Sequence, residues 1–194
     1  MFRQLPIDCL NDILEFLEED KNTLYSCLLV NRLWCEISVR ILWRNVLGHG
    51  LTTRNSFRML LACLSDESKE LLQMNGIVIS TPTLKSPLFN YVSFCNALSI
   101  SVINNAIEHF AFKRNLLIGR PKPSVVVLLK QEILKMLMKE IATLKKLSCS
   151  DFDYFGTSDY EAEAITFIRF PGAKECLKNL LASRRYIIIV RMIL

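Results

Sequence analysis

The sequence predicts a mainly α-helical protein, with a small N-terminal helical module followed by a larger α-rich region. Apolar residues recur at helical spacing along most of the chain, and 51% of the 194 residues are hydrophobic against 22% charged. This composition is too apolar for an intrinsically disordered chain. The length allows roughly one or two domains, which is too short for a large catalytic barrel.

The apolar pattern argues against membrane insertion and export. Uninterrupted apolar runs such as 125–129 and 186–190 are short, whereas a membrane-spanning helix needs about 20 such residues. The N-terminal stretch carries acids among its apolar residues and has no small-residue cleavage site, unlike a signal peptide. We expect a protein of the cytoplasm or the nucleus.

The cysteines indicate a reducing compartment rather than a disulfide framework. There are seven, an odd number, scattered beside apolar residues with no C-x-x-C pair. We expect them to be reduced and buried. Neither His49 nor His109, the two histidines, lies at ligand spacing from a pair of cysteines, so the sequence predicts no metal site and no cofactor.

Charge changes sign between two neighbouring stretches of the chain. Residues 1–20 carry one base against six acids, whereas residues 21–60 carry six bases against one acid. This pattern indicates either two helices that attract each other or two faces presented to different partners. It does not indicate a uniform nucleic-acid-binding surface, although the net charge is +5.

The first helix is expected from about Asp8 to Leu17. Pro6 suits a position at or before the first turn, and Asp8 and Asp12 lie near the positive end of the helix dipole. The apolar stripe of this helix consists of Ile7, Leu10, Ile13, Leu14 and Leu17. Acidic residues then end the stripe.

Two more short helices follow. Leu24 and Leu28 lie one turn apart in the second segment, which ends near Val30. The third helix is marked by Leu33, Trp34, Ile37, Ile41 and Leu42. Three helices of this length bury little apolar surface and have more apolar side chains than they can hide, which is typical of a module that docks on a partner.

These residues carry a resemblance to a known family. The pattern Leu5-Pro6-x-Asp8-Cys9-Leu10 is followed in order by Val30-Asn31-Arg32-x-Trp34 and Leu42-Trp43. It resembles the F-box motif of the type common in fungal F-box families, from Leu5 to about Asn45. Single pieces of this pattern also occur in ordinary helical cores. Trp34 and Trp43 are interpreted as core, and Asn31-Arg32 as a helix cap and a solvated base.

The resemblance implies a partner and a site. In F-box proteins, the three helices dock on a Skp-family adaptor, which links them to a cullin-RING ubiquitin ligase. The resemblance assigns eight residues to adaptor contact or to holding the module's shape: Leu5, Pro6, Leu10, Ile13, Leu17, Leu24, Leu28 and Val30. We assign residues 1–46 to this module.

Residues 47–87 are expected to form a connector helix and loop. Gly48-His49-Gly50 interrupts the helical pattern, and a short helix ending near Ser65-Asp66 resumes it. Its apolar positions are Phe57, Leu60, Leu61 and Leu64. The turn-rich stretch from Ser80 to Pro87 is the predicted boundary.

Residues 88–194 are predicted to form an α-rich substrate-binding region. Helices are expected over 88–98, over 102–110 and, after a break at 119–123, from Val125 to Lys145 with Ser124 as N-cap. The stripe of the last and longest helix is Leu129, Ile133, Leu137, Ile141 and Leu144.

An alternative interpretation makes this region the first repeats of an α/β leucine-rich solenoid. Leu144-x-x-Leu147-x-Cys149 resembles a leucine-rich repeat opening, and Leu177-x-x-Leu180-x-Ala182 would be the next copy. Their spacing of 33 residues exceeds the usual 20–29. The stretch 186–194 is predicted to be a strand, which either closes an array shortened relative to its relatives or packs inward.

The sequence predicts no enzyme. It lacks phosphate-binding and nucleophile-elbow glycine motifs, and the calcium-like Asp151-x-Asp153 stretch has Phe155 and Ala162 where oxygen ligands are needed. The bases between residues 113 and 122 are interpreted as a surface loop, so nucleic acid is the weakest alternative. The expected function is a ligase adaptor that tethers an unknown protein substrate, with an F-box protein acting outside a ligase as the alternative.

Overall fold

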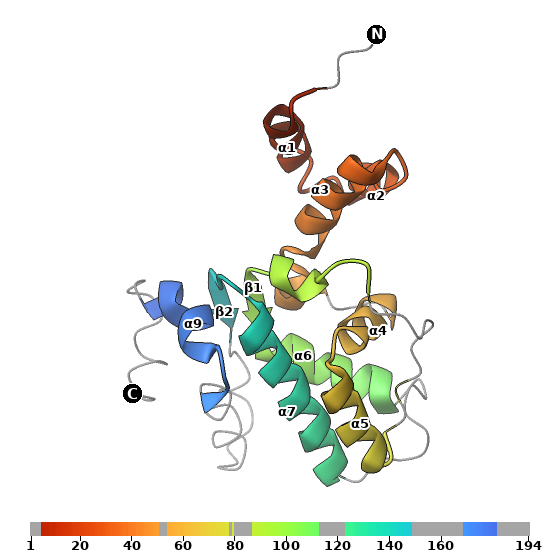
Figure 1. The fold of residues 1–194 in the computed structure, drawn as a ribbon, viewed down its shortest axis with the longest axis vertical. Coiled ribbons are helices and arrows are strands. Elements are labelled where there is room, and N and C mark those ends of the chain that lie inside the picture. The colour runs from red at the N-terminus through yellow and green to blue at the C-terminus, as the bar shows by residue number, and fades with distance from the viewer. Residues whose placement is uncertain are drawn as a thin grey trace. The chain divides into compact units, whose positions relative to one another are not determined.

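The computed structural model describes residues 5–50, 54–77, 79, 87–112, 123–148 and 169–181. These residues are mainly helical (Figure 1), as predicted. The chain divides into two compact units, Met1–Arg44 and Asn45–Leu194. Among the described helices, none is long and apolar enough to cross a membrane.

The first unit consists of the three expected helices. They are α1 (Ile7–Glu15), α2 (Lys21–Cys27) and α3 (Arg32–Trp43). The side chain of Asp20 caps α2 by accepting a hydrogen bond from the Thr23 amide. Asn31 caps α3 by accepting one from the Trp34 amide at 3.0 Å, which confirms its predicted role.

The core of the first unit joins all three helices. It contains Leu10, Leu14, Leu24, Cys27, Ile37 and Ile41, with Leu17, Leu33, Trp34 and Leu42 packed against it. Trp34 and Trp43, predicted to be core residues, are only half-buried, and Trp34 packs against this core. Helix α3 packs against both α1 and α2, so it is the element that holds the module together.

Side-chain hydrogen bonds connect the C-terminal half of α3 to α1 and the residues just after it. Arg44, at the end of α3, donates to Glu15 at 3.0 Å and to Glu18 at 3.3 Å. The hydrogen bond to Glu15 raises the pKa of Arg44 above its ordinary value. Arg40 donates to the side chain of Asn11 at 3.2 Å. Of the two interpretations of the charge pattern, these contacts support attraction between helices.

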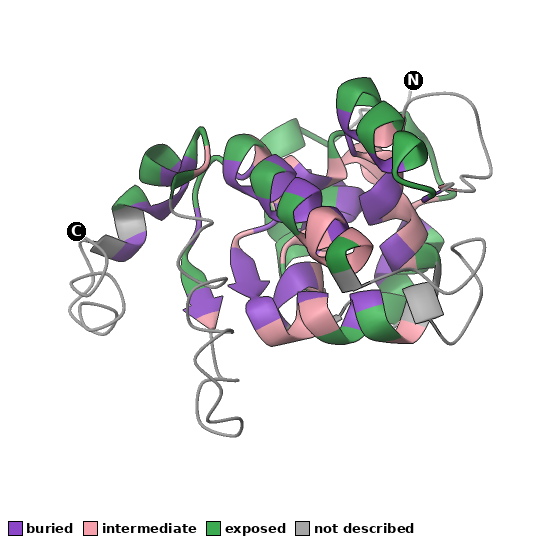
Figure 2. Ribbon diagram, turned by 90° about the horizontal axis from the view of Figure 1, so that it is seen from below, coloured by how far each residue is buried: buried purple, intermediate pink, exposed green. Residues whose placement is uncertain are grey.

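The second unit is larger and also mainly helical. Its elements are η1 (Val46–Gly50), α4 (Arg54–Ala62), α5 (Asp66–Met74), η2 (Tyr91–Phe94), β1 (Ala97–Ser99), α6 (Ile100–Ala106), η3 (Ile107–Phe112), α7 (Pro123–Glu140), β2 (Lys146–Ser148) and α9 (Ala173–Leu181). Its described helices pack their buried sides toward neighbouring elements (Figure 2).

The predicted connector differs from the structure in three places. The Gly48-His49-Gly50 stretch is a π-helical turn, not a break, and a Cβ on Gly48 would lie 2.9 Å from the Cβ of Ala97. Helix α4 has the predicted buried stripe but ends at Ala62. The sequence prediction missed α5, whose N-cap is Ser65, accepting from the Ser68 amide at 3.2 Å.

The helix predicted over 88–98 is wrong. This stretch forms the short η2 turn and then β1, which pairs in parallel with β2 so that Leu98 lies opposite Leu147. Leu98 is buried in this pairing, which is distant in sequence, whereas Leu88 is 79% exposed. Such pairing overrides the local pattern. The helix predicted next is confirmed as α6 and η3.

Helix α7 is the longest described helix, but its ends differ from the prediction. It begins at Pro123, so Ser124 lies in the first turn and is not the cap, and it ends at Glu140 rather than Lys145. The predicted stripe is nevertheless buried at all five positions, including Ile141 and Leu144 beyond the helix end. Proline suits the first turn because it needs no hydrogen-bonded amide there.

The solenoid interpretation is not supported. The predicted strand at Leu147 is confirmed as β2, but Leu177 and Leu180 lie in helix α9 with Ala173 and Cys176, all buried at helical spacing. Within the described residues, the second predicted copy is therefore a helix and not a strand. The stretches 113–122, 149–168 and 182–194, including the predicted terminal strand, lie outside the described residues.

The cysteines follow the prediction only in part. The six described cysteines are free, and Cys27, Cys95 and Cys176 are buried, but Cys9 is exposed. Burial raises the pKa of Cys63 to about 11 and that of Cys95 to about 12. The described residues contain no cluster that could hold a metal ion.

The raised thiol pKa values predict a loss of stability at alkaline pH. The pKa of Cys95 is about 12 in the folded state, above its ordinary value of 9.0. The free energy of unfolding is therefore unaffected by this thiol below pH 9. Above pH 9 it falls, because the unfolded state loses the thiol proton before the folded state does. The slope is at most about 1.4 kcal/mol per pH unit for one thiol. Urea unfolding between pH 8 and 11 should show this slope flattened by Cys95→Ala but not by Cys9→Ala. Equal slopes in the two variants would contradict it.

Candidate partner-binding surface

The eight residues assigned from the F-box resemblance fall into two groups. Leu10 and Leu24 are 2% and 0% exposed and belong to the core of the first unit, and Leu17 and Leu28 are half-buried. The exposed group is Leu5, Pro6, Ile13 and Val30. The first group therefore holds the shape of the module, and only the second is freely accessible to a partner.

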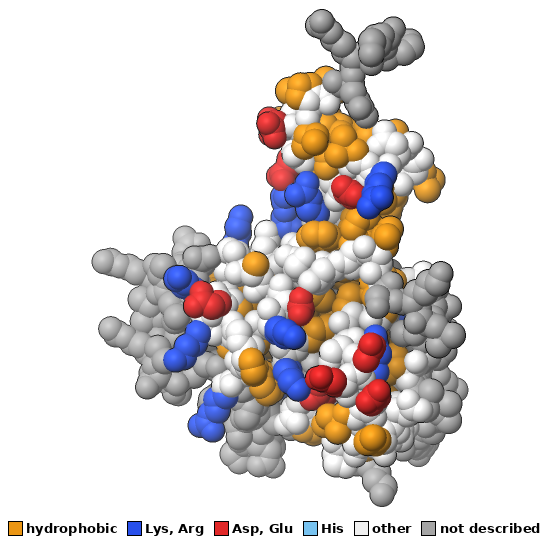
Figure 3. Space-filling model, in the orientation of Figure 1, with side chains coloured by type: hydrophobic (Ala, Val, Ile, Leu, Met, Phe, Trp, Pro, Cys, Tyr) orange, Lys and Arg blue, Asp and Glu red, His pale blue; other side chains and the backbone are white. Residues whose placement is uncertain are grey.

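Further large apolar side chains are exposed on the same unit. They are Ile7, Phe16, Tyr25 and Leu29, with Phe16 95% and Leu29 88% exposed. Orange atoms gather over this part of the molecule in Figure 3. Such a concentration of exposed apolar side chains on a small unit is characteristic of a protein-binding surface.

Helix α1 presents part of this surface along one face. Ile13 follows the exposed Cys9 by four residues and precedes Phe16 by three, so the three side chains lie along one line of the helix. Leu10 and Leu14 take the adjacent, buried line. The sequence analysis did not select Phe16, although its spacing of three residues from Ile13 places both side chains on one face of the helix.

The turn after α2 presents the other part. The Leu29 amide donates to the Ser26 carbonyl at 3.1 Å, and the Val30 amide donates to the Cys27 carbonyl at 3.3 Å. These bonds hold a tight turn in which Leu29 and Val30 are both exposed. The local backbone hydrogen bonds therefore keep both apolar side chains in exposed positions.

The exposed side chains of this surface are mainly apolar. Glu15 and Glu18, the acids at the end of α1, are engaged by Arg44. The pKa of Asp20 is lowered by its hydrogen bonds with Thr23, so this carboxylate is already used as a helix cap. The arrangement therefore suits burial against an apolar partner surface.

Comparison with known protein families identifies the first unit. Residues 2–48 match the F-box-like family. This range includes Leu5-Pro6 and Leu42-Trp43, the first and last pieces of the motif. Residues 2–48 form an F-box-like domain. No curated protein and no solved structure matches the chain at a significant level. The resemblance found in the sequence is confirmed for this domain.

Proposed function

We propose that this protein is a substrate-recognition adaptor of a Skp-cullin-F-box ubiquitin ligase. The observation that carries the proposal is an F-box-like domain whose motif residues Leu5, Pro6, Ile13 and Val30 are exposed together with Phe16 and Leu29. F-box domains as a class bind Skp-family adaptors, and their proteins are typically non-catalytic. The exposed apolar residues would be the contact surface for that adaptor.

The proposed role is that of a tether. Binding a substrate on one unit and the adaptor on the other raises the effective concentration of the substrate near the ubiquitin-loaded enzyme. The bond-forming chemistry then belongs to other subunits. The role requires no cofactor or metal from this chain.

The second unit is proposed to bind the substrate. Its α5, from the predicted connector 47–87, packs against α7, from the predicted substrate-binding region 88–194. The Ser68 hydroxyl donates to Glu132 across this contact. Because the two stretches share a core, we assign substrate binding to the whole unit from residue 45 onward rather than to residues 88–194 alone.

Replacing Leu5 and Pro6 together by Ala tests the adaptor surface. The Pro6 carbonyl accepts from the Leu10 amide at 3.1 Å, and Ala keeps that carbonyl, so the helix start is preserved. Removal of one anchor commonly costs about 2 kcal/mol or more, so affinity for a Skp-family adaptor should fall at least tenfold by calorimetry.

Footprinting provides a second measurement of the same contact. Bound adaptor should slow alkylation of the exposed Cys9, read by mass spectrometry, while the buried Cys95 serves as the internal reference. Unchanged affinity in a folded double variant would refute the assignment. Co-purification with a cullin distinguishes a ligase subunit from an F-box protein that acts outside a ligase.

A further inference from the structure

The second unit contains a cavity of about 370 Å³. It lies among the beginning of α5, the 87–91 segment and the C-terminal half of α7. Pro87, Phe89 and Met136 supply apolar walls, and Lys135 and Lys139 of α7 supply cations. This volume is at the lower end of the range for ligand sites.

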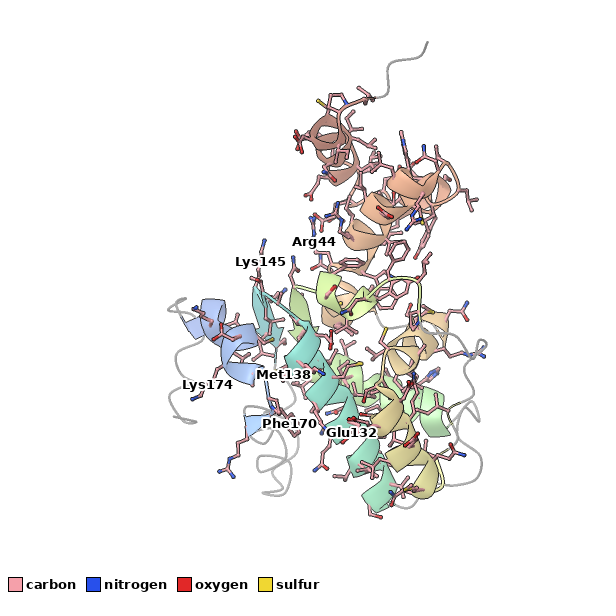
Figure 4. All side chains as sticks on the ribbon, in the orientation of Figure 1. Arg44, Glu132, Met138, Lys145, Phe170 and Lys174 are labelled. Carbon is pink, nitrogen blue, oxygen red and sulfur yellow. The ribbon has the colours of Figure 1, made fainter. Side chains whose placement is uncertain are left out.

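The cavity walls are held by side-chain contacts. The Ser68 hydroxyl donates to Glu132, which lies on the side of α7 nearest α5 (Figure 4), and Glu132 is only 7% exposed. Asn90 donates to Glu140 at 2.7 Å. The rings of Phe89 and Tyr91 pack edge to face with centroids 5.8 Å apart. The walls therefore need little rearrangement to accept a ligand.

The charged side chains that are available to bind a ligand differ between the α7 side and the α5 side of the cavity. On α7, the acids Glu132 and Glu140 already accept hydrogen bonds from Ser68 and Asn90. Lys135 lies 3.6 Å from Glu132, whereas Lys139, one turn further along, has no ion pair or hydrogen bond with any described residue. On α5, the exposed carboxylate of Glu67 disfavours a second acid. An incoming carboxylate is therefore directed toward α7.

We propose that this cavity binds a short segment of the protein substrate in which an apolar residue is next to an acidic residue. The apolar side chain lies between Phe89, Pro87 and Met136, and the carboxylate lies against Lys135 and Lys139. Glu67 and Glu140, the two carboxylates that line the cavity, disfavour the repeated phosphates of a nucleic acid. This inference rests on the proposed function, because it takes the ligand to be a protein substrate.

Methyl NMR of the full chain labelled at methionine tests the proposal directly. The probes are two blocked dipeptides, N-acetyl-Phe-Glu-amide and N-acetyl-Phe-Lys-amide. The methyl signal of Met136, which lines the cavity, should shift saturably with the Phe-Glu probe, and the Phe-Lys probe should bind at least fivefold more weakly. The methyl of Met74, 84% exposed and outside the cavity, reports non-specific binding.

Charge reversal provides the matched comparison. Lys139→Glu should invert the preference between the two probes, whereas Lys174→Glu, an exposed lysine of α9 outside the cavity, should leave it unchanged. Equal affinities for the two probes, no saturable shift of Met136, or the same response in both variants would overturn the inference.

Adaptor binding measured on the same samples separates this inference from the proposed function. If the adaptor binds normally and the probes fail, the cavity inference is wrong and the ligase proposal stands. If the probes bind at Met136 as expected but no adaptor binds, the ligase proposal is wrong and the cavity remains a peptide site.

Discussion

Replacement of Leu24 by Ala is expected to unfold the first unit at moderate temperature. Leu24 is fully buried among α1, α2 and α3, and truncation of a buried leucine costs about 2–5 kcal/mol. A unit of this size has little stability in reserve. Adaptor binding should be lost together with the fold.

Phe16→Ala is the contrasting variant. Phe16 is 95% exposed, so its removal should leave the stability of the unit unchanged while reducing adaptor affinity roughly thirtyfold, as expected for an interface anchor. Both tryptophans of the chain, Trp34 and Trp43, lie in this unit, so tryptophan fluorescence follows its unfolding selectively. A destabilised Phe16→Ala variant, or a stable Leu24→Ala variant, would contradict the division into shape and contact residues.

The second large effect is expected for Gly172→Ala in the other unit. Gly172 has φ +85°, and a Cβ there would lie 2.6 Å from the carbonyl oxygen of Met138 in α7. Backbone atoms cannot move aside cheaply, so the left-handed strain and the clash together should cost about 3 kcal/mol or more and detach α9 from α7. Urea unfolding followed by circular dichroism, with unchanged tryptophan fluorescence, measures this loss.

Gly76→Ala is the matched control for that effect. Its φ of +83° is nearly the same, but no atom lies within 4 Å of a Cβ placed there. Only the backbone strain remains, which costs about 1 kcal/mol. If the two substitutions cost the same, the close approach of Gly172 to α7 does not contribute to stability.

The F-box-like domain was predictable because its structure is local. Its helices α1, α2 and α3 are short, their caps lie next to them in sequence, and their apolar stripes face a core made within about forty residues. What the pattern could not show was which apolar residues face outward. Leu10 and Ile13 belong to the same sequence stripe, yet the first is buried and the second exposed, because α3 covers only one side of α1.

The second unit was less predictable because its decisive contacts are distant in sequence. Helices α6 and α7 follow their own periodicity, but β1 exists only through its pairing with β2. The Leu177 and Leu180 pattern fits a repeat strand as well as a helix, and burial against α7 makes it a helix.

The sequence by itself determined the helical class, the F-box motif and the three N-terminal helices, because each depends on neighbouring residues. Only the tertiary structure decided which motif residues remain exposed, where α7 meets α5 and α9, and that Glu132 holds Ser68 in place beside a cavity. Those features depend on which surfaces pack together, and residues far apart in the chain determine that packing.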